Sequence, residues 1–399
     1  MSKFRYVAVN GYGVELNGTI DASSKDDAME KLIENNIFPK EISKYRQGLD
    51  IKKHFHKVTF KEIVVFSRQF AFIINSGFPL LDGISVVREQ MKNERLKEIL
   101  HQVYRGVEKG GSLGGELEKY DEFPDLYVNM VKSAETSGNL GEILDRLAEY
   151  YNTQYKIKKK IASAMTYPMI VFGASLLIVS FIIIFILPKF IENVIDGGGK
   201  IPFITLIFMN ISNIIINYGI FIIVIGGFLI YKFKEKLKNN RAMAIKLDRK
   251  KLDRPIFGKL NRMVIAAKFS RTLGTLLVSG IGIIEALDLC GKVVGNKYIE
   301  NRMEIVKEKV EKGEAIGNSI RNIDVLPPIL IQSIVVGERG GNLDEILAKT
   351  AVFYENDVEI LATQLSSVIE PLIIIFLGGL IAIIAISMYL PLFSMYNAV

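Results

Sequence analysis

The sequence predicts a mainly α-helical membrane protein with two duplicated six-helix bundles, three transmembrane helices and a small N-terminal α/β module. Three observations support this fold class. The chain repeats one unit at a constant offset, its apolar residues recur at helical spacing, and three long stretches carry no charged side chain. Stretches of this length are sufficient to cross a bilayer as helices.

Short motifs of the repeated unit return in the same order along the chain. Glu135 corresponds to Glu338, and every other matching pair shares this offset without an insertion. Chance does not hold one register across so many pairs, so we interpret the pattern as a duplication. Further pairs are Phe66-Ser67-Arg68 and Phe269-Ser270-Arg271, Ser76-Gly77 and Ser279-Gly280, Gly138-Asn139-Leu140 and Gly341-Asn342-Leu343, and Leu187-Pro188 and Leu390-Pro391.

The composition indicates soluble domains joined to membrane spans. Of the 399 residues, 49% are hydrophobic and 23% are charged, and 50 basic against 43 acidic residues leave a net charge of +7. The single cysteine, Cys290, excludes a disulfide framework and a cysteine-based metal site, and it is expected to be a buried helix residue. Residues 1–10 lack the basic and apolar segments of a signal peptide, so no cleaved leader is expected.

Residues 1–47 are predicted to form the α/β module. Residues 4–9 alternate like a half-buried strand, and residues 14–20 offer a second strand. Ser23-Ser24 precedes two aspartates, which predicts a helix N-terminus, and Pro39 is expected to end this helix. The apolar stripe of the helix is predicted to be Ala28, Leu32 and Ile33.

Residues 58–160 are predicted to form the first cytoplasmic bundle, and residues 261–363 its second copy. Six helices with short connections favour a bundle. Asn139 is expected to cap the sixth helix, with Glu142 completing a capping box. The other predicted helix boundaries of the first copy are at Ser76-Gly77, Pro79, Gly110-Gly111, Ser112, Pro124 and Gly138.

Transmembrane helices are predicted at residues 168–188, 211–231 and 371–391. The sixth helix of the first bundle shows no stop signal before the first span. Residues 189–210 are expected to be an outer loop followed by an interfacial segment. Three glycine sites, Gly173, Gly226-Gly227 and Gly378-Gly379, are expected to allow close approach of helices within the membrane.

Basic residues beside the spans predict the topology. The lysine cluster from Lys156 to Lys160 precedes the first span, and the basic segment 232–241 follows the second. Such clusters mark cytoplasmic ends. No charged side chain remains after Glu370. The N-terminus and both bundles are therefore expected in the cytoplasm, with a short C-terminal tail outside.

Motifs for catalysis, cofactor binding or metal binding are not apparent. Residues 110–114 match the G-x-S-x-G nucleophile elbow, but a charged helix precedes them and no histidine follows, so they are interpreted as a helix terminus. Residues 197–200 lack the remaining positions of a P-loop. His54 and His56 lie in a polar linker at residues 48–57 without a third ligand, so solvated histidines are expected.

Three polar positions occur in both copies and are the candidate interface or structural positions. They could stabilise the bundles through polar contacts. Alternatively, they could form docking surfaces, or the acidic ones could gather at an interface and attract a cation. The pairs are Arg68 with Arg271, Asp82 with Glu285, and Glu135 with Glu338.

These features together resemble the type II secretion system F family, which includes the inner-membrane platform protein of type IV pilus assembly. The resemblance rests on the repeated Phe-Ser-Arg…Ser-Gly helix pair, on the Glu-x-x-Gly-Asn-Leu-x-x-Ile-Leu motifs at residues 135–144 and 338–347, on the three spans and on the N-terminal module. It covers essentially the whole chain. It provides no catalytic residues to carry over.

The resemblance implies a non-enzymatic protein of the bacterial inner membrane. Its bundles would engage a hexameric secretion or pilus assembly ATPase, and its spans would receive pilin or pseudopilin subunits. Other inner-membrane assembly components and a homo-oligomer, as a dimer or larger, are also implied. No cofactor and no nucleic acid are expected. Pilus assembly, protein secretion and competence uptake remain equally compatible with the sequence.

Two other classes of function were weighed. A channel or transporter is disfavoured because the predicted first and third spans contain no ionisable residue, whereas transporters usually place one near the membrane midplane. A membrane-anchored enzyme is disfavoured because no motif for catalysis, cofactor binding or metal binding is apparent in the sequence. Solute flux in proteoliposomes would support the first class, and turnover of ATP or a phosphoester by the purified protein would support the second.

Overall fold

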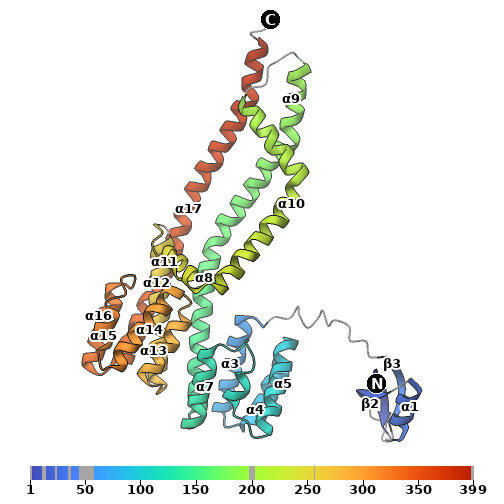
Figure 1. Cartoon of the computed structure of the whole chain (residues 1–399), viewed down its shortest axis with the longest axis vertical. Helices are drawn as coiled ribbons and strands as arrows, with labels where there is room; N and C mark the ends of the chain where they lie inside the picture. Colours follow the sequence, from blue (N-terminus) through green and yellow to red (C-terminus); the bar gives the residue numbers. More distant parts are fainter. Residues whose placement is uncertain are drawn as a thin grey trace. The chain divides into compact units, whose positions relative to one another are not determined.

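The computed structural model describes residues 2–10, 15–22, 25–34, 37–44, 58–196, 203–255 and 257–396. The chain divides into two compact units (Figure 1). One consists of Met1–Val58 with Lys92–Glu98, and the other of Thr59–Met91 with Ile99–Val399. The labels of Figure 1 are used for all helices and strands.

The N-terminal segment forms a three-stranded antiparallel sheet with one helix. The sheet has the order β2-β1-β3, with β1 (Ser2–Asn10) between β2 (Glu15–Ala22) and β3 (Ile37–Lys44). Helix α1 (Lys25–Glu34) connects β2 to β3.

The prediction that Pro39 ends the helix was wrong, because α1 ends at Glu34 and Pro39 lies within β3. Strand β3 is an edge strand, where a residue without an N–H is tolerated, and its pairing with β1 shifts register beside Pro39. Leu32 is buried as expected, but Ile33 is exposed, so the predicted stripe was too wide.

Six helical segments form the first bundle. Helix α3 begins with a capping box in which the Glu62 amide donates to Thr59 Oγ1 at 3.3 Å and the Thr59 amide donates to Glu62 Oε2 at 2.6 Å. The segments are α3 (Phe60–Asn75), α4 (Leu80–Gln90), α5 (Glu94–Glu108), α6 (Leu113–Leu117), α7 (Asp125–Ser137) and the first part of α8 (Leu140–Phe181).

Asn139 is the N-cap residue of α8, as predicted, but its side chain makes no capping hydrogen bond, so the predicted capping box is absent. The preceding residue, Gly138, ends α7 with a φ of +77°, and Gly341 ends the equivalent helix of the second bundle with a φ of +70°. This left-handed conformation favours glycine, which explains why both copies have Gly-Asn here.

Aromatic side chains fill the core of the first bundle. The rings of Phe66, Phe123 and Tyr127 contact one another, with centroids 5.6 Å apart for Phe66 and Phe123 and 5.4 Å for Phe123 and Tyr127. Tyr151 of α8 packs on Tyr127 at 5.8 Å. Helices α3, α7 and α8 are therefore held together by one cluster.

The second bundle repeats this order. Its counterparts of Phe66 and Tyr151, namely Phe269 and Tyr354, are also buried, and the buried Cys290 thiol donates to the Phe269 carbonyl at 3.5 Å. The segments are α12 (Phe257–Val278), α13 (Ile283–Val293), α14 (Lys297–Glu311), α15 (Ile316–Ile320), α16 (Pro328–Gly340) and the first part of α17 (Leu343–Tyr396).

Two helical stretches of the described residues, Leu140–Asp196 and Leu343–Leu390, are long and apolar enough to cross a membrane. Helix α10 (Phe203–Asn239) provides a third candidate if its halves Thr205–Gly219 and Val224–Leu237, bent by 73°, are counted as one span. The chain is thus a mainly α-helical membrane protein. The count of three spans stays a prediction.

The first candidate span passes through a wide helical turn. Helix α8 continues into a π-helix, η1 (Ile182–Ile186), and then into α9 (Leu187–Asp196). Pro188, the second residue of α9, comes just after this π-helix. In a regular α-helix its ring would clash with the carbonyl four residues earlier, and the wider π turn removes such a clash. Because α9 reaches Asp196, the prediction of a loop beginning at residue 189 was wrong.

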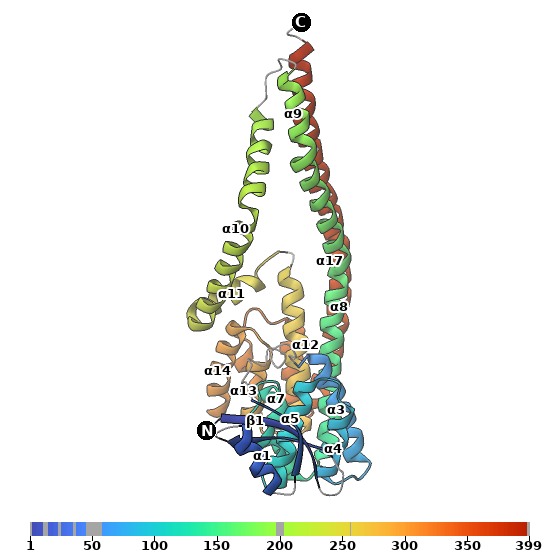
Figure 2. The ribbon, with the colours of Figure 1, turned by 90° about the vertical axis from the view of Figure 1, so that its right-hand side faces the viewer.

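A small apolar core joins the membrane helices. It contains Val179, Ile183, Leu187 and Ile191 from α8, η1 and α9, together with Phe208 of α10 and Ile384 of α17. Beside it, the buried Thr205 hydroxyl donates to the Ser387 carbonyl at 2.8 Å. Figure 2 shows α8 and α17 running beside one another.

The membrane glycines make no close helix contact within this chain, so their predicted role stays a prediction. A Cβ placed on any of them would meet no atom within 4 Å, so these glycines do not bring two described helices together. The residues are Gly173, Gly226, Gly227, Gly378 and Gly379.

Candidate functional site

The repeated glutamates bind the start of a short helix in each bundle. Glu135 of α7 accepts hydrogen bonds from the backbone amides of Leu113 at 2.5 Å and Gly114 at 2.9 Å. In the second bundle, Glu338 of α16 accepts from the amides of Ile316 at 2.6 Å and Gly317 at 2.9 Å. A carboxylate at a helix N-terminus is stabilised by these free N–H groups.

The glycines at these short helices allow the close approach. A Cβ on Gly114 would lie 2.5 Å from Lys132 Cγ, and a Cβ on Gly317 would lie 2.4 Å from Val335 Cγ2. Only glycine therefore fits against the neighbouring helix. Ser112 caps the first of these helices by accepting from the Gly115 amide at 3.1 Å. Residues 110–114 thus form a helix terminus, as predicted.

The repeated arginines differ between the copies. Arg271 of α12 forms a bidentate ion pair with Glu355 of α17, at 2.8 Å for Nε and 2.7 Å for Nη2, and both side chains are mostly buried. The hydrogen bonds to Glu355 raise the pKa of Arg271. Arg68 is exposed, and Asn152 stands where the second copy has Glu355.

The third repeated pair, Asp82 and Glu285, lies on the surface. These residues are exposed in the first turns of α4 and α13, where a negative charge interacts favourably with the helix dipole. The six candidate positions therefore do not gather at one place. No group of three or more His, Cys, Asp or Glu side chains suited to a metal ion occurs among the described residues.

Polar contacts join α8 and α17 where they leave the bundles. The Ser366 hydroxyl donates to the Ala164 carbonyl at 2.7 Å, and the Tyr167 hydroxyl donates to Glu370 Oε1 at 3.2 Å. Tyr167 and Glu370 are 203 residues apart, so they occupy equivalent positions of the repeat. The two long helices therefore lie in matching register at this crossing.

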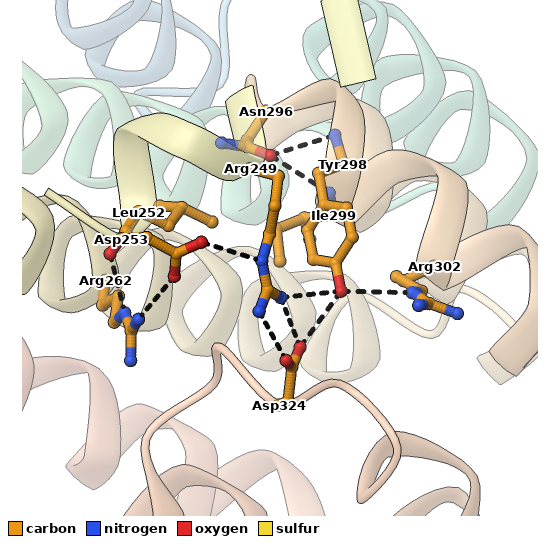
Figure 3. Close-up of polar contacts among 9 residues, drawn as sticks. All are labelled: Arg249, Leu252, Asp253, Arg262, Asn296, Tyr298, Ile299, Arg302 and Asp324. Carbon is orange, nitrogen blue, oxygen red and sulfur yellow. Dashed lines mark hydrogen bonds and ion pairs between the residues drawn. The ribbon is translucent and has the colours of Figure 1, made fainter. Parts of the chain in front are cut away.

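A cluster around Arg249, missed by the sequence analysis, joins α11 (Arg241–Leu252) to the second bundle (Figure 3). The Arg249 guanidinium donates to Asp324 Oδ1 at 2.5 Å and to Oδ2 at 2.6 Å, and its Nη1 also donates to the Tyr298 hydroxyl at 2.8 Å. Tyr298 in turn donates to Asp324 at 3.0 Å. Helix α11, helix α14 and the segment before α16 meet here.

Charge and hydrogen bonding fix the protonation of this cluster. The hydrogen bonds from Arg249 are the main reason that the pKa of Asp324 falls to about 2. On the other side of the Arg249 guanidinium, the Asp253 carboxylate accepts hydrogen bonds from Arg249 Nε at 3.2 Å and from Arg262 Nη2 at 3.0 Å (Figure 3). Every carboxylate drawn is thus paired with a guanidinium, which is typical of a structural junction.

The junction connects a candidate membrane helix to a bundle. Helix α11 follows α10 directly, with Asn240 as its N-cap, so Arg249 lies ten residues beyond the end of a membrane helix candidate. The mixture of basic and acidic residues from Lys246 to Arg254 was the available signal in the sequence. The sequence analysis interpreted only the basic segment 232–241, as a cytoplasmic flank, and gave no role to Arg249.

Comparison with known proteins agrees with this architecture. Residues 66–188 and 269–391 each match the model described as type II secretion system (T2SS), protein F. Residues 1–43 match the type II secretion system protein F, N-terminal domain. The two matched segments of the first model have the boundaries of the internal repeat.

Curated relatives match over nearly the full length. The type IV pilus assembly protein PilC of Thermus thermophilus is 34% identical over 401 residues, covering 99% of this chain and 98% of the relative. The protein of the same name from Pseudomonas aeruginosa is 33% identical over 356 residues, covering 89% and 95%. The type II secretion system protein F of Pseudomonas aeruginosa is 29% identical over 407 residues, covering all of both. The chain therefore belongs to the type II secretion system protein F family, which includes type IV pilus assembly proteins.

Proposed function

We propose that this chain is the non-enzymatic inner-membrane platform of a type IV pilus or type II secretion machine. Its two bundles engage a cytoplasmic assembly ATPase, and its membrane helices receive pilin or pseudopilin subunits. Movement of the bundles, driven by the ATPase, lifts the apolar helix of a subunit out of the bilayer into the growing fibre. The names of the relatives support pilus assembly or secretion as the setting.

The observation that carries the proposal is the continuity of two helices between the two environments. Helix α17 runs without a break for 54 residues, from the second bundle into its apolar stretch. Helix α8 runs for 42 residues, from the first bundle into its own apolar stretch. At about 1.5 Å per residue, α17 is far longer than the roughly 30 Å of a hydrocarbon core. A continuous helix transmits tilt and rotation from its base to its tip.

The remaining membrane helix is also attached to a bundle. The Arg249 cluster holds α11 on the second bundle, and α11 follows α10. A shift of the second bundle is therefore expected to move α10 as well as α17. The first bundle controls α8 in the same way. This arrangement supports a role in transmitting motion rather than in chemistry.

The proposal is tested by breaking the continuity of α17 between the bundle and the membrane. Thr363 is exposed on α17 in this region. Thr363→Pro removes a helical hydrogen bond and kinks the helix, at a cost of about 3 kcal/mol. We expect a strain with this variant in place of the wild type to insert the protein in the membrane at normal levels but to assemble no fibres, seen by electron microscopy.

The matched control is Thr363→Ala, which removes only a local hydroxyl bond to Glu359. It is expected to support normal fibre assembly. Fibre assembly at the wild-type level with Thr363→Pro would rule out transmission through α17. Fibre assembly in a strain that lacks the chain altogether would rule out the platform role itself.

A further inference from the structure

A cleft lies between α8 and α17, on the bundle side of the crossing at Ala164 and Ser366. Its volume is about 500 Å³, and ligand-binding clefts commonly measure about 300–1,000 Å³. Helix α8 contributes a row of basic and hydroxyl side chains, and α17 contributes acidic ones. The residues that matter here are Lys156, Lys159, Lys160 and Ser163 of α8, with Glu355 and Glu359 of α17.

The cleft holds more positive than negative charge. Glu355 is neutralised by the bidentate ion pair described above, and Glu359 forms an ion pair with Lys160. Lys156 and Lys159 are exposed and pair with no carboxylate among the described residues. Two ammonium groups therefore remain at the cleft without a counter-charge from the part of the chain that the structure describes, which favours an anionic ligand.

The repeat shows that the fold does not require this basic cluster. Helix α17 enters its apolar stretch at the same register as α8, yet the sequence contains no lysine or arginine after Lys349. The lysines are therefore a feature of α8 alone. Their counterparts on α17, in the order of Lys156, Lys159 and Lys160, are Glu359, Ala362 and Thr363.

An exposed stripe continues the cleft along α8 towards the membrane. Lys156, Lys159 and Ser163 are spaced so that they share one face of the helix, and Tyr167 and Ile170 continue the same face. Tyr167 is 56% exposed and Ile170 is 64% exposed. The face thus changes from basic through hydroxyl and aromatic to aliphatic. A phospholipid presents the matching order from its headgroup to its acyl chains.

The depth of the cleft agrees with the position of a headgroup. Ser163 precedes Pro168, where the span is predicted to begin, by five residues, which is about 7–8 Å of helix. The headgroup region on each side of a bilayer is about 5–7 Å thick. Lysine side chains are long enough to extend towards this region. A soluble anion would require the lysines but not the apolar stripe beside them.

We propose that this cleft binds the headgroup of an anionic phospholipid from the surrounding bilayer. The ammonium groups of Lys156 and Lys159 bind its phosphate, the Ser163 hydroxyl donates to it, and an acyl chain lies along Tyr167 and Ile170. Basic pockets between membrane helices recognise anionic headgroups in this way. The bound lipid lies against both helices that leave the bundles. Its binding does not depend on the platform role.

Tryptophan fluorescence of the full chain in vesicles tests the proposal. The chain has no tryptophan, so Ile170→Trp introduces a single reporter on the exposed stripe. The purified protein is reconstituted in phosphatidylcholine vesicles that contain a small fixed fraction of brominated phosphatidylglycerol or, for comparison, of brominated phosphatidylcholine. Bromine quenches a neighbouring tryptophan. We expect much stronger quenching by the anionic lipid, and equal quenching by the two lipids would overturn the proposal.

Charge-neutral variants locate the preference for anionic lipid. Lys156→Gln combined with Lys159→Gln is expected to lower it roughly tenfold or more, whereas arginine at both positions should preserve it. The matched control, Lys158→Gln with Lys234→Gln, also removes two charges beside membrane helices. Lys158 lies near Lys268 of α12, where burial and then the Lys158 charge lower the pKa of Lys268. The control should therefore keep the preference.

Three further outcomes would contradict the proposal. Equal losses in the glutamine variant and its control would mean that any basic residue near the surface attracts the lipid. The same preference at Phe228→Trp, an exposed position of α10 beside the basic segment 232–241, would also mean this. Loss of the preference on adding sn-glycerol 3-phosphate at constant ionic strength would assign the cleft to a soluble phosphate instead.

Discussion

The two bundles share their interiors but differ in what their surfaces meet. In each, a glutamate binds the start of a short helix with the same two amide contacts. The arginine of the repeat, by contrast, is paired and mostly buried as Arg271 in the second bundle and exposed as Arg68 in the first. The shared glutamates therefore maintain each bundle, whereas the surroundings of the shared arginine show where a bundle meets another element.

The largest effect is expected from removing a shared glutamate. Glu338→Ala leaves the amides of Ile316 and Gly317 without their acceptor, and each charge-assisted hydrogen bond contributes roughly 1.5 kcal/mol or more. We expect the start of α15 to lose about 3 kcal/mol of local stability. Hydrogen exchange of the full chain, followed at residues 316–320, measures this loss.

The same change in the first bundle sharpens the comparison. Glu135→Ala should destabilise α6 by a similar amount, because the contacts are equivalent. Glu285→Ala, at an exposed repeated position, is the control and should change exchange little. A large effect in one bundle and none in the other would contradict the idea that the shared glutamates have one structural role.

The next largest effect should appear in the second bundle alone. Glu355→Gln leaves Arg271 mostly buried without a full charge partner, and breaking such a pair costs about 2 kcal/mol when burial is incomplete. Hydrogen exchange of α12 is expected to increase accordingly. Asn152→Ala, at the counterpart position of the first bundle, should leave α3 within about 0.5 kcal/mol of the wild type. Equal effects in both bundles would show that the arginines are equivalent after all.

The sequence was sufficient to predict what depends on local pattern. The duplication, the helix ends at Gly138 and Gly341 and the buried Cys290 agree with the structure. These features follow from apolar periodicity and from backbone conformations that need glycine.

Features that depend on distant residues were missed. The acceptor for the amides of Leu113 and Gly114 lies more than 20 residues away on another helix, and no local pattern indicates the pairing. Arg249 and Asp324 are 75 residues apart. Strand β3 was missed because the local preference of Pro39 against strands is overridden at a sheet edge.

A smaller effect is expected from acid, at the junction that only the second bundle has. The folded pKa of Asp324 is about 2, below the ordinary value of 3.8, so its contribution to stability is complete above about pH 4 and is lost as the pH falls through about 2. Because this side chain is more than half exposed, screening limits the contribution to less than about 1 kcal/mol.

Fluorine NMR of a label on Lys250→Cys in the Cys290→Ala background is expected to report loosening of α11 between pH 4 and pH 2. Lys250 is exposed beside Arg249, so the label does not disturb the cluster. Asp324→Asn should loosen α11 at all pH values and abolish the transition in this window. An unchanged transition in Asp324→Asn would assign it to another group.

The smallest effect is expected from giving the first bundle the ion pair of the second. Asn152→Glu places a carboxylate at the counterpart of Glu355, opposite the exposed Arg68. Around Arg271, Glu149 and Tyr150 of α8 line the same small cleft, whereas Arg68 is exposed. An exposed pair contributes about 0.2–1 kcal/mol, so the gain measured by exchange of α3 in dilute protein should be a few tenths of a kcal/mol. A gain of about 2 kcal/mol would instead mean that coverage by α8 does not determine the difference between the two arginines.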